Sequence, residues 1–366
     1  SMRKNKPKIY WGLWPVSMLY GIGASIRNKL FDWGMLRSRS FPFPLICIGN
    51  LTVGGTGKTP HTEYLIRLLK KEFKVAALSR GYKRETKGFV LASSSSTAAE
   101  IGDEPFQMAR KFPDITVAVD ADRCEGINLI QEKCPATEVI LLDDAFQHRY
   151  VTPGLSVLLT DYNRPIYEDQ LLPAGRLRET RNGKKRADII IVTKCPAGLS
   201  DTEQESIKRK LQPHSGQEVL FTTMKYGKLQ PLFANAAERS LDSLKKQEEI
   251  LLLTGIASPD GLAKTLRTHC DKVRLLAFPD HHAFDRQDLQ KLERMFGQLT
   301  ADRRLIVTTE KDAARLRMHQ LSNVLKESIY TLPIEVEFIN KQETIFNKKI
   351  IEYVRKNSRN SSIHQS

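Results

Sequence analysis

The clearest chemical pattern in the chain is the segment GNLTVGGTGKTP at positions 49–60. An apolar run precedes it and an amphipathic run follows it, which is the strand–loop–helix context of a phosphate-binding loop. The backbone N–H groups of such a loop form an anion site at a helix N-terminus. We predict that Lys58 reaches the β- and γ-phosphates of a nucleotide and that the Thr59 hydroxyl binds Mg²⁺. A flexible glycine loop without a ligand is the alternative, and Thr52 stands where the common pattern has glycine. The residues expected to bind the nucleotide are Thr52, Val53, Gly54, Gly55, Thr56, Gly57, Lys58 and Thr59.

Paired acids follow another apolar run. In EVILLDDAFQHR, Asp143 and Asp144 stand directly after the predicted strand. In a phosphate-loop protein a carboxylate at this place positions Mg²⁺. A turn or a helix cap is the alternative interpretation of Asp-Asp. Gln147 and His148 add an amide and an imidazole to the same corner, which favours a functional site.

Three further segments carry polar groups, and each has an ordinary structural alternative. GDEPFQMAR places Asp103 at the start of a predicted helix, where an acid also stabilises the helix N-terminus. FPDHHAF places His281 after a strand, although adjacent histidines are common on surfaces and lack the spacing of a metal pair. LLPAGRLRETRNGKKR is a basic loop with one acid, Glu179, and suits either solvent or a phosphate clamp.

The overall composition favours an anionic partner. The 366 residues are enough for two α/β domains, and the formal charge is +15. Such a charge suits nucleic acid, anionic lipid or a phosphorylated substrate. The five cysteines are scattered and lack metal-ligand spacing, so we expect reduced thiols in a cytosolic compartment.

The first 35 residues predict a membrane-associated helix. An uncharged run, IYWGLWPVSMLYGIGASI, is rich in aromatics and flanked on both sides by Lys and Arg. Trp and Tyr settle at the headgroup level of a bilayer, and cations suit anionic lipid. We expect this helix to lie on or slightly within the inner leaflet of a membrane, on its cytoplasmic side. A helix packed against the protein's own core is the alternative.

The remaining elements indicate an α/β fold with two lobes. Short apolar runs alternate with helical periods from residue 36 to 222, which predicts a doubly wound sheet of the P-loop NTPase type. A second βαβαβ block begins near residue 249. Extended segments at 219–233 and 329–339 predict a two-stranded ribbon between the lobes. We therefore expect an N-terminal helix (1–35), a P-loop core (36–222), a second lobe with the ribbon (223–340), and a C-terminal helix over 341–356 followed by a disordered tail to 366.

The order of the motifs supports a resemblance to a known family. GNLTVGGTGKTP, SRGY, GDEP, DDAFQHR, LLPAGRLRE, FPDHH and TTEKDAARL occur in this sequence after an aromatic N-terminal segment. In this run of motifs, from about Ile9 to Leu316, the chain resembles the tetraacyldisaccharide 4′-kinase family of lipid A biosynthesis. One departure is Ala145, where the family usually has glycine after the paired acids.

The resemblance implies ATP-dependent phosphorylation of the 4′-hydroxyl of an acylated glucosamine disaccharide 1-phosphate, with Mg²⁺, by a monomer at the inner membrane. It implies two α/β/α lobes joined by a β-ribbon. It implies that Asp143, Asp144 and Glu179 bind Mg²⁺ and that Lys58 neutralises charge on the phosphoryl group being transferred. It also implies that Asp103, paired with His281, accepts the proton of the hydroxyl. The expected substrate contacts are Arg80, Tyr82, Arg123, Gln147, His148 and Arg176.

Two other functions are less consistent with the sequence. A nucleic-acid-dependent ATPase would also use the positive charge. However, the aromatics gather in the uncharged N-terminal run instead of alternating with cations as a stacking surface requires, so we expect no nucleic-acid partner. A GTP-dependent switch would need an Asp at the position that Pro196 occupies in IVTKCP.

Overall fold

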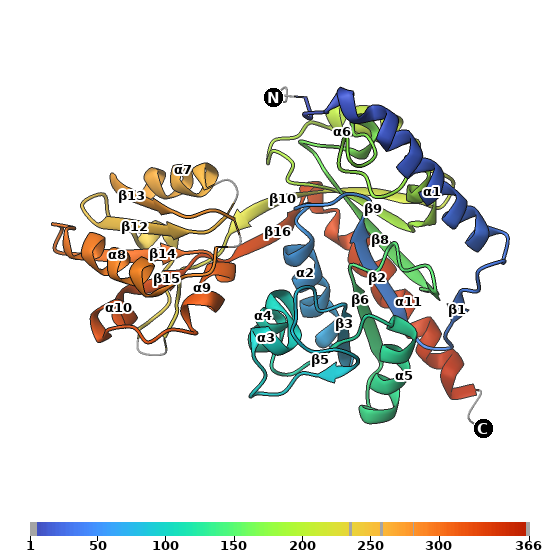
Figure 1. The fold of residues 1–366 in the computed structure, drawn as a ribbon, viewed down its shortest axis with the longest axis horizontal. Coiled ribbons are helices and arrows are strands. Elements are labelled where there is room, and N and C mark those ends of the chain that lie inside the picture. Colours follow the sequence, from blue (N-terminus) through green and yellow to red (C-terminus); the bar gives the residue numbers. More distant parts are fainter. Residues whose placement is uncertain (1–5, 234–235, 257–258, 281, 364–366) are drawn as a thin grey trace. The chain divides into compact units, whose positions relative to one another are not determined.

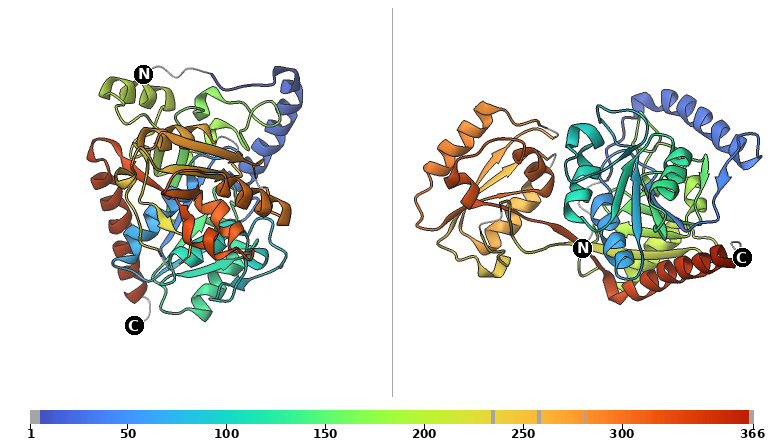
Figure 2. Two further views of the ribbon diagram at one scale, coloured as in Figure 1. Left: turned by 90° about the vertical axis from the view of Figure 1, so that its left-hand side faces the viewer. Right: turned by 90° about the horizontal axis from the view of Figure 1, so that it is seen from below.

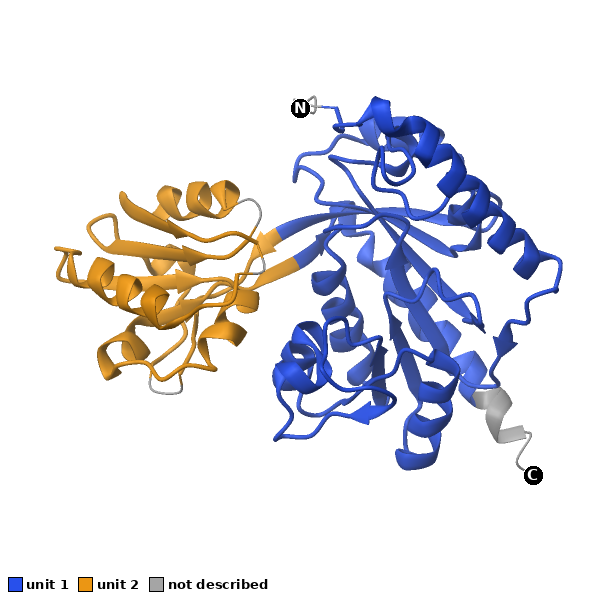
Figure 3. Cartoon of the chain, viewed as in Figure 1, with its two compact units in different colours: residues 1–224, 336–366 blue, residues 225–335 orange. Residues whose placement is uncertain are grey.

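The computed structural model describes residues 6–233, 236–256, 259–280 and 282–363, with side chains described to Ser358. It divides the chain into two compact units (Figure 3). Unit 1 comprises Ser1–Met224 and Val336–Ser366, and unit 2 comprises Lys225–Glu335.

Unit 1 is built on a nine-stranded sheet (Figure 1). The strands run in the order β16-β10-β9-β8-β2-β6-β3-β5-β4. From β10 to β5 all neighbours are parallel, and β4 is antiparallel to β5. Their bounds are β2 Leu45–Asn50, β3 Val75–Ser79, β4 Val90–Leu91, β5 Thr116–Val119, β6 Val139–Asp143, β8 Leu155–Asp161, β9 Ile189–Thr193, β10 Glu218–Tyr226 and β16 Ile334–Phe338.

Helices cover both faces of this sheet, because alternate strand residues point to opposite sides. Cys47 of β2 belongs to the core cluster that holds Ile127 and Leu211, from α5 (Arg123–Lys133) and α6 (Asp201–Leu211). Its neighbour Ile48 belongs to the opposite cluster with α2 (Lys58–Lys70), α4 (Asp103–Lys111) and α11 (Glu343–Ile363) (Figure 2). This confirms the predicted doubly wound α/β architecture. The smaller elements of the unit are η1 Trp11–Leu13, β1 Arg39–Ser40, α3 Ala98–Ile101, β7 Val151–Thr152, η2 Ile166–Glu168, η3 Arg181–Arg186 and η5 Ile339–Lys341.

The C-terminal helix is longer than the sequence indicated. The prediction ended the helix at Lys356, whereas α11 continues to Ile363. Residues 364–366 of the predicted tail lie outside the described residues. Polar side chains in its last turns bond to carbonyls of the preceding turn: Asn357 Nδ2 donates to Tyr353 O (2.8 Å), and Ser358 Oγ donates to Val354 O (2.9 Å). Such bonds are compatible with a continuing helix.

Unit 2 is a smaller α/β/α unit. Its five-stranded sheet has the order β11-β15-β14-β12-β13, with β11 antiparallel to β15 and the other neighbours parallel. One face packs against α7 and the other against α8, α9 and α10. The bounds are β11 Gln230–Pro231, η4 Leu241–Ser243, β12 Glu249–Thr254, α7 Asp260–His269, β13 Lys272–Ala277, α8 Arg286–Gly297, β14 Arg304–Thr308, α9 Glu310–Leu316, α10 Asn323–Ser328 and β15 Ile329–Thr331.

Of the extended segments expected to form a ribbon, 219–233 contains β11 and all but the first residue of β10, and 329–339 contains β15 and β16. Strands β11 and β15 belong to the sheet of unit 2, and β10 and β16 belong to the sheet of unit 1. Strands β10 and β16 are neighbours at one edge of the nine-stranded sheet. The division between the units falls inside both strands, after Met224 in β10 and before Val336 in β16.

The N-terminal helix α1 (Trp14–Asp32) buries only Ser17, Gly21 and Phe31. Its small residues face the segment 171–174: Ser17 Oγ donates to Leu171 O (3.0 Å) and accepts from Ala174 N (2.9 Å). Most of its other apolar residues are exposed, for example Leu19 at 71%. Phe31, near its end, is the large apolar residue that the helix buries. Among the residues that the structure describes, no helix has the length and apolar character needed to cross a bilayer.

Candidate functional site

The predicted strand–loop–helix order is present at residues 45–70. Strand β2 ends at Asn50, and α2 begins at Lys58 with Gly57 as its N-cap. Gly54 (φ +100°) and Gly57 (φ +82°) have left-handed backbones, which glycine adopts without the steric cost of a Cβ. The loop therefore needs glycine at these two positions.

The start of this loop is paired with the segment LLPAGRLRE. Thr52 forms an antiparallel bridge with Leu177. On either side, Val53 N donates to Arg176 O (2.9 Å), and Arg178 N donates to Leu51 O (2.7 Å). The Arg176 guanidinium lies beside Gly54, since Nη1 would be 3.7 Å from a Cβ built there. This places Arg176 and the basic segment against the phosphate loop.

Lys58 lies between two carboxylates. Its Nζ is 2.9 Å from Asp143 Oδ1 and 3.0 Å from Glu104 Oε2. Burial alone would lower the pKa of Lys58, but the negative charges of Asp143, Glu104 and Asp144 outweigh it and hold the pKa above its usual value. The lysine therefore remains charged at any physiological pH. Sequence reasoning missed Glu104, whose only signal was its place beside Asp103 in GDEP.

The paired acids have different surroundings. Asp143 is 3% exposed and also accepts from Ser79 Oγ (3.3 Å) and Thr62 Oγ1 (3.4 Å). Burial raises its pKa, and the charge of Lys58 opposes the rise. Asp144 is half-exposed, and its Oδ1 is 3.2 Å from Arg178 Nη2.

The turn at the paired acids explains the tolerance of alanine at position 145. The left-handed residue of this turn is Asp144, with φ +52°. Asp tolerates that conformation better than most residues. Ala145 is buried, and because the left-handed φ belongs to Asp144, a glycine is not required after the acids.

The oxygen ligands available near the loop suit Mg²⁺. Within the described ranges, no three His, Cys, Asp or Glu side chains form a metal-binding group. Mg²⁺ does not need one, because it is commonly held by one or two carboxylates together with substrate phosphates. The Thr59 hydroxyl and the carboxylates of Asp143 and Asp144 match that chemistry. Glu179, the fourth expected ligand, is 3% exposed and pairs in a bidentate manner with Arg186 (2.7 and 3.0 Å).

A basic cluster adjoins the paired acids. Arg123 is buried, and burial together with the charge of Arg80 lowers its pKa. Burial, reinforced by the positive charges of Arg123, Arg27 and Arg80, lowers the pKa of His148 to about 4. Arg27 Nη1 donates to Gln147 O (3.2 Å). Among the described residues, Arg123 Nε, Gln147 Oε1 and His148 Nε2 are buried without a hydrogen-bond partner. Buried polar atoms are normally paired, so this cluster has unused capacity for a ligand.

The motifs SRGY and GDEP are adjacent in space. Gly81 (φ +75°) and Gly102 (φ +94°) are both left-handed. A Cβ on Gly102 would lie 3.1 Å from Tyr82 O, and one on Gly81 would lie 3.2 Å from Ile101 O. Tyr82, which is 75% exposed, and the exposed Asp103 at the start of α4 therefore belong to one corner.

The motif FPDHH lies in unit 2, after β13. His281 lies outside the described residues. Its neighbour Asp280 is 3.6 Å from Lys311 Nζ. His282 stacks on Phe278 with ring centroids 4.7 Å apart, and its Nε2 is 2.7 Å from Asp288 Oδ2. His282 is thus engaged inside its own unit.

Comparisons with known proteins show the family of the chain. The family described as Tetraacyldisaccharide-1-P 4'-kinase matches residues 9–354. The tetraacyldisaccharide 4'-kinase of Bacteroides fragilis (strain YCH46) is 56% identical to this chain, and the match covers 99% of this chain and 98% of that protein. The tetraacyldisaccharide 4'-kinase of Flavobacterium johnsoniae is 45% identical, and the match covers 94% of this chain and 97% of that protein. The crystal structure of LpxK from Aquifex aeolicus in complex with ATP is similar with a TM-score of 0.72 and 30% identity, covering 94% of this chain and 98% of that one.

The chain belongs to the tetraacyldisaccharide-1-P 4'-kinase family. The resemblance inferred from the motifs is thereby confirmed. The comparisons do not assign roles to single residues, so the predicted roles of Lys58, Asp103 and the Mg²⁺ ligands remain predictions.

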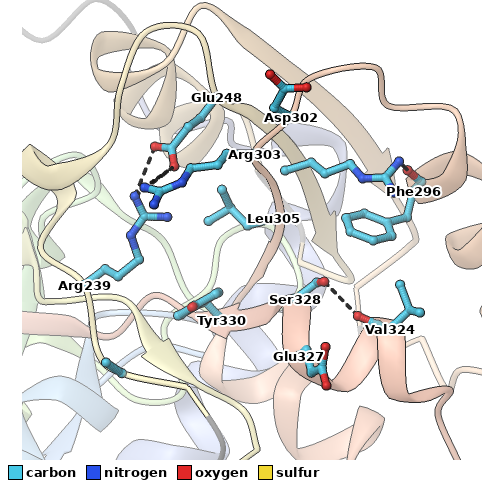
Figure 4. A pocket seen from close by; sticks show the side chains of 12 residues that line it. Arg239, Glu248, Phe296, Asp302, Arg303, Leu305, Val324, Glu327, Ser328 and Tyr330 are labelled. Carbon is cyan, nitrogen blue, oxygen red and sulfur yellow. Dashed lines mark hydrogen bonds and ion pairs between the residues drawn. The ribbon is translucent and has the colours of Figure 1, made fainter.

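This family member also has a depression in unit 2, away from the carboxyl ends of the strands (Figure 4). Two of its three arginines are held by short contacts: Arg239 Nη2 is 3.0 Å from Glu248 Oε1, and Arg304 Nη1 donates to Leu299 O (2.9 Å). Ligands of open α/β sheets bind at the carboxyl ends of the strands, whereas Arg304 begins β14. We assign no function to this depression.

Proposed function

We propose that this chain is an ATP-dependent kinase that transfers the γ-phosphate to the 4′-hydroxyl of tetraacyldisaccharide 1-phosphate in lipid A biosynthesis. Membership of the tetraacyldisaccharide-1-P 4'-kinase family supports the substrate and the reaction. The observation that carries the proposal in the structure is Lys58, at the start of α2, held by Asp143 at the end of β6. A similar chain binds ATP in its crystal structure.

In this proposal the phosphate loop and Lys58 align the nucleotide. Backbone N–H groups at the start of α2 donate to phosphate oxygens, and the permanently charged Lys58 neutralises the β- and γ-phosphates. Mg²⁺, held by Thr59, Asp143 and Asp144 with assistance from Glu179, would neutralise further charge on the phosphates. Alignment and charge neutralisation supply most of the acceleration in phosphoryl transfer.

Asp103 is the proposed proton acceptor, paired with His281. The 4′-hydroxyl oxygen bonds to the γ-phosphorus as the bond from phosphorus to the bridging oxygen of ADP breaks. The hydroxyl proton passes to the Asp103 carboxylate, because a sugar hydroxyl is a poor nucleophile while it keeps its proton. Asp103 lies on the exposed corner formed by SRGY and GDEP, which supports access of a substrate to it.

The basic cluster is proposed to contact the anionic acceptor. Arg80 and Arg123 supply positive charge, and Arg123 Nε and His148 Nε2 are buried without a partner among the described residues. Tyr82, Gln147 and Arg176 complete the proposed contacts. Guanidinium groups are well suited to phosphate oxygens.

The outward face of the N-terminal helix is proposed to dock on the cytoplasmic face of the inner membrane. Its small and polar residues face the protein, while aromatic and aliphatic side chains are exposed. Aromatic rings and flanking cations favour the interface of an anionic bilayer. The exposed set is Tyr10, Trp11, Leu13, Trp14, Val16, Met18, Leu19, Ile22, Ile26, Trp33 and Met35. We further propose that the enzyme is a monomer and that β10 and β16 form the ribbon between its lobes.

Phosphate transfer tests the proposal directly. The purified chain is incubated with Mg²⁺, γ-labelled ATP and tetraacyldisaccharide 1-phosphate in detergent micelles, and labelled lipid and free phosphate are separated. We expect label in the lipid, dependent on the acceptor. Release of label only as inorganic phosphate, stimulated by nucleic acid and not by lipid, would support the alternative of a P-loop ATPase acting on an anionic polymer.

A further inference from the structure

Three consecutive carbonyl groups of the phosphate loop each accept a hydrogen bond from a side chain. Lys194 Nζ donates to Gly55 O (2.8 Å). Thr193 Oγ1 donates to Thr56 O (2.6 Å). His61 Nδ1 lies 2.6 Å from Gly57 O. Thr193 and Lys194 come from the end of β9, and His61 comes from the first turn of α2. None of the three belongs to the phosphate-loop pattern.

The contacts of His61 fix which ring nitrogen carries the proton. The Gly57 carbonyl can only accept, so Nδ1 must be the donor. Nε2 is then the acceptor, and the Thr222 hydroxyl, 2.8 Å away, donates to it. This arrangement requires a neutral imidazole. His61 is 3% exposed, and burial lowers its pKa to about 4, so the ring is neutral at physiological pH.

Holding the carbonyls also orients the amide groups that face the ligand. A peptide unit is planar and trans, so its N–H points opposite to its C=O. Fixing the carbonyls of Gly55, Thr56 and Gly57 therefore fixes the N–H groups of Thr56, Gly57 and Lys58. These are the donors that a phosphate-binding loop presents to its ligand.

We propose that Thr193, Lys194 and the pair His61–Thr222 are positioning residues that preorganise three backbone donors for the phosphates of ATP. The inference rests on the proposed function, because it takes the ligand of the loop to be ATP. Preorganised donors stabilise anionic charge more than mobile donors do, because they need no reorientation when the charge arrives. Side chains outside the loop thereby set its affinity for nucleotide.

Matched threonine substitutions separate positioning from stability. Thr193→Val removes the donor to Thr56 O while keeping the shape of the side chain, and Thr193→Ser keeps the hydroxyl. Thr308→Val in unit 2 is the control, because Thr308 is also a buried threonine at a strand end whose hydroxyl donates to a carbonyl, Leu253 O (2.9 Å). Each variant of the full chain is examined for its melting temperature and, by calorimetry, for its Kd for ATP with Mg²⁺.

We expect Thr193→Val to raise the Kd for ATP about fivefold to tenfold, the ratio that loss of one hydrogen bond produces. Thr193→Ser should stay within about twofold of wild type. Thr308→Val should lower the melting temperature without changing the Kd. If Thr193→Val does not fold, Thr222→Val and Thr222→Ser make the same comparison through His61.

An unchanged Kd in Thr193→Val and Thr222→Val, with melting temperatures lowered as in Thr308→Val, would overturn the inference. That outcome leaves the proposed function intact, since phosphate transfer by the wild-type chain decides it separately. Conversely, a wild-type chain that binds ATP without transferring phosphate to lipid contradicts the proposed function, while the ratio of variant to wild-type Kd still decides the inference.

Discussion

Replacing Lys58 with methionine should destabilise unit 1 strongly at neutral pH. The substitution keeps the length of the side chain but removes the charge that lies 2.9 Å from Asp143 Oδ1. Asp143 is 3% exposed, and its hydrogen bonds from Ser79 and Thr62 are long, at 3.3 and 3.4 Å. Removing one partner of a buried ion pair costs about 3–5 kcal/mol, because the other charge stays buried without compensation.

This cost corresponds to a large shift in melting temperature. For domains of about 150–250 residues, 1 kcal/mol changes the melting temperature by about 2–4 °C. We therefore expect Lys58→Met to melt about 6–20 °C below wild type at pH 7, measured by scanning fluorimetry without nucleotide. The matched control is Lys70→Met on the same helix. Its partner Asp114 is 57% exposed, and an exposed pair contributes about 1 kcal/mol or less.

The pH dependence of the difference in melting temperature between Lys58→Met and wild type shows whether the unpaired charge of Asp143 causes it. Burial raises the pKa of Asp143, and loss of Lys58 should raise it further. A carboxyl whose folded-state pKa lies above its unfolded value favours folding below the unfolded pKa and loses that contribution as pH rises through the folded pKa. The gap between Lys58→Met and wild type should therefore narrow as pH falls from 7 toward 4. Adding Asp143→Asn to Lys58→Met should recover much of the lost stability at pH 7. Equal melting temperatures of Lys58→Met and wild type at pH 7, or a difference in melting temperature that does not depend on pH, would refute the reasoning.

Three further outcomes are expected. The pKa of His61 is about 4 in the folded chain and 6.5 in the unfolded chain, so the unfolded chain binds the proton first as pH falls. The free energy of unfolding should therefore decrease by about 3 kcal/mol as pH falls from 6.5 to 4. The free energy of unfolding measured in urea should depend less on pH for His61→Gln than for wild type. The same dependence on pH in both proteins would contradict this. Leu19→Glu, on the exposed face of α1, should reduce co-sedimentation with anionic liposomes and leave the Kd for ATP unchanged; full sedimentation would show that this face is not the docking surface. Asp103→Asn should lower kcat for lipid phosphorylation at least a hundredfold with little change in the KM for ATP, whereas a helix-stabilising role alone predicts a loss of about 1 kcal/mol in stability and nearly normal turnover.

Much of unit 1 could be predicted because the physical signals are local. The run ADIIIVTK predicts a strand buried on both faces, and β9 (Ile189–Thr193) is buried throughout. The phosphate loop is equally local, since Gly54 and Gly57 need left-handed backbones within a few residues of Lys58. A hydrophobic period or a glycine requirement can be read without knowing which distant segment lies beside it.

The contacts that complete the site could not be predicted, because they depend on the order of strands in the sheet. Strand β2 lies between β6 and β8, which brings Lys58 to Asp143. The pairing of Thr52 with Leu177 and the bond from Thr193 to Thr56 O likewise join segments far apart in the chain. Nothing in the pattern around residue 104 indicates that Glu104, rather than Asp103, contacts Lys58. Strand order is a global property that local periodicity does not contain.

The N-terminal helix has the phosphate site on one side and the proposed membrane-docking surface on the other. Its inward side is hydrogen-bonded to residues around the phosphate site: Tyr20 Oη donates to Arg178 O (2.8 Å), Arg27 Nη1 to Gln147 O (3.2 Å) and Asn28 Nδ2 to Glu179 Oε1 (3.4 Å). Its outward side carries the exposed apolar side chains proposed to dock on the membrane. A lipid acceptor keeps its acyl chains in an apolar phase while its sugar hydroxyl must meet a nucleotide dissolved in water. In the proposed arrangement, a helix about 10–12 Å across, bonded on one side to the nucleotide corner and apolar on the other, would hold these two environments at a fixed separation. The sequence alone shows the apolar residues of this helix, whereas the buried Ser17 and Gly21 and these hydrogen bonds reveal which side faces the protein.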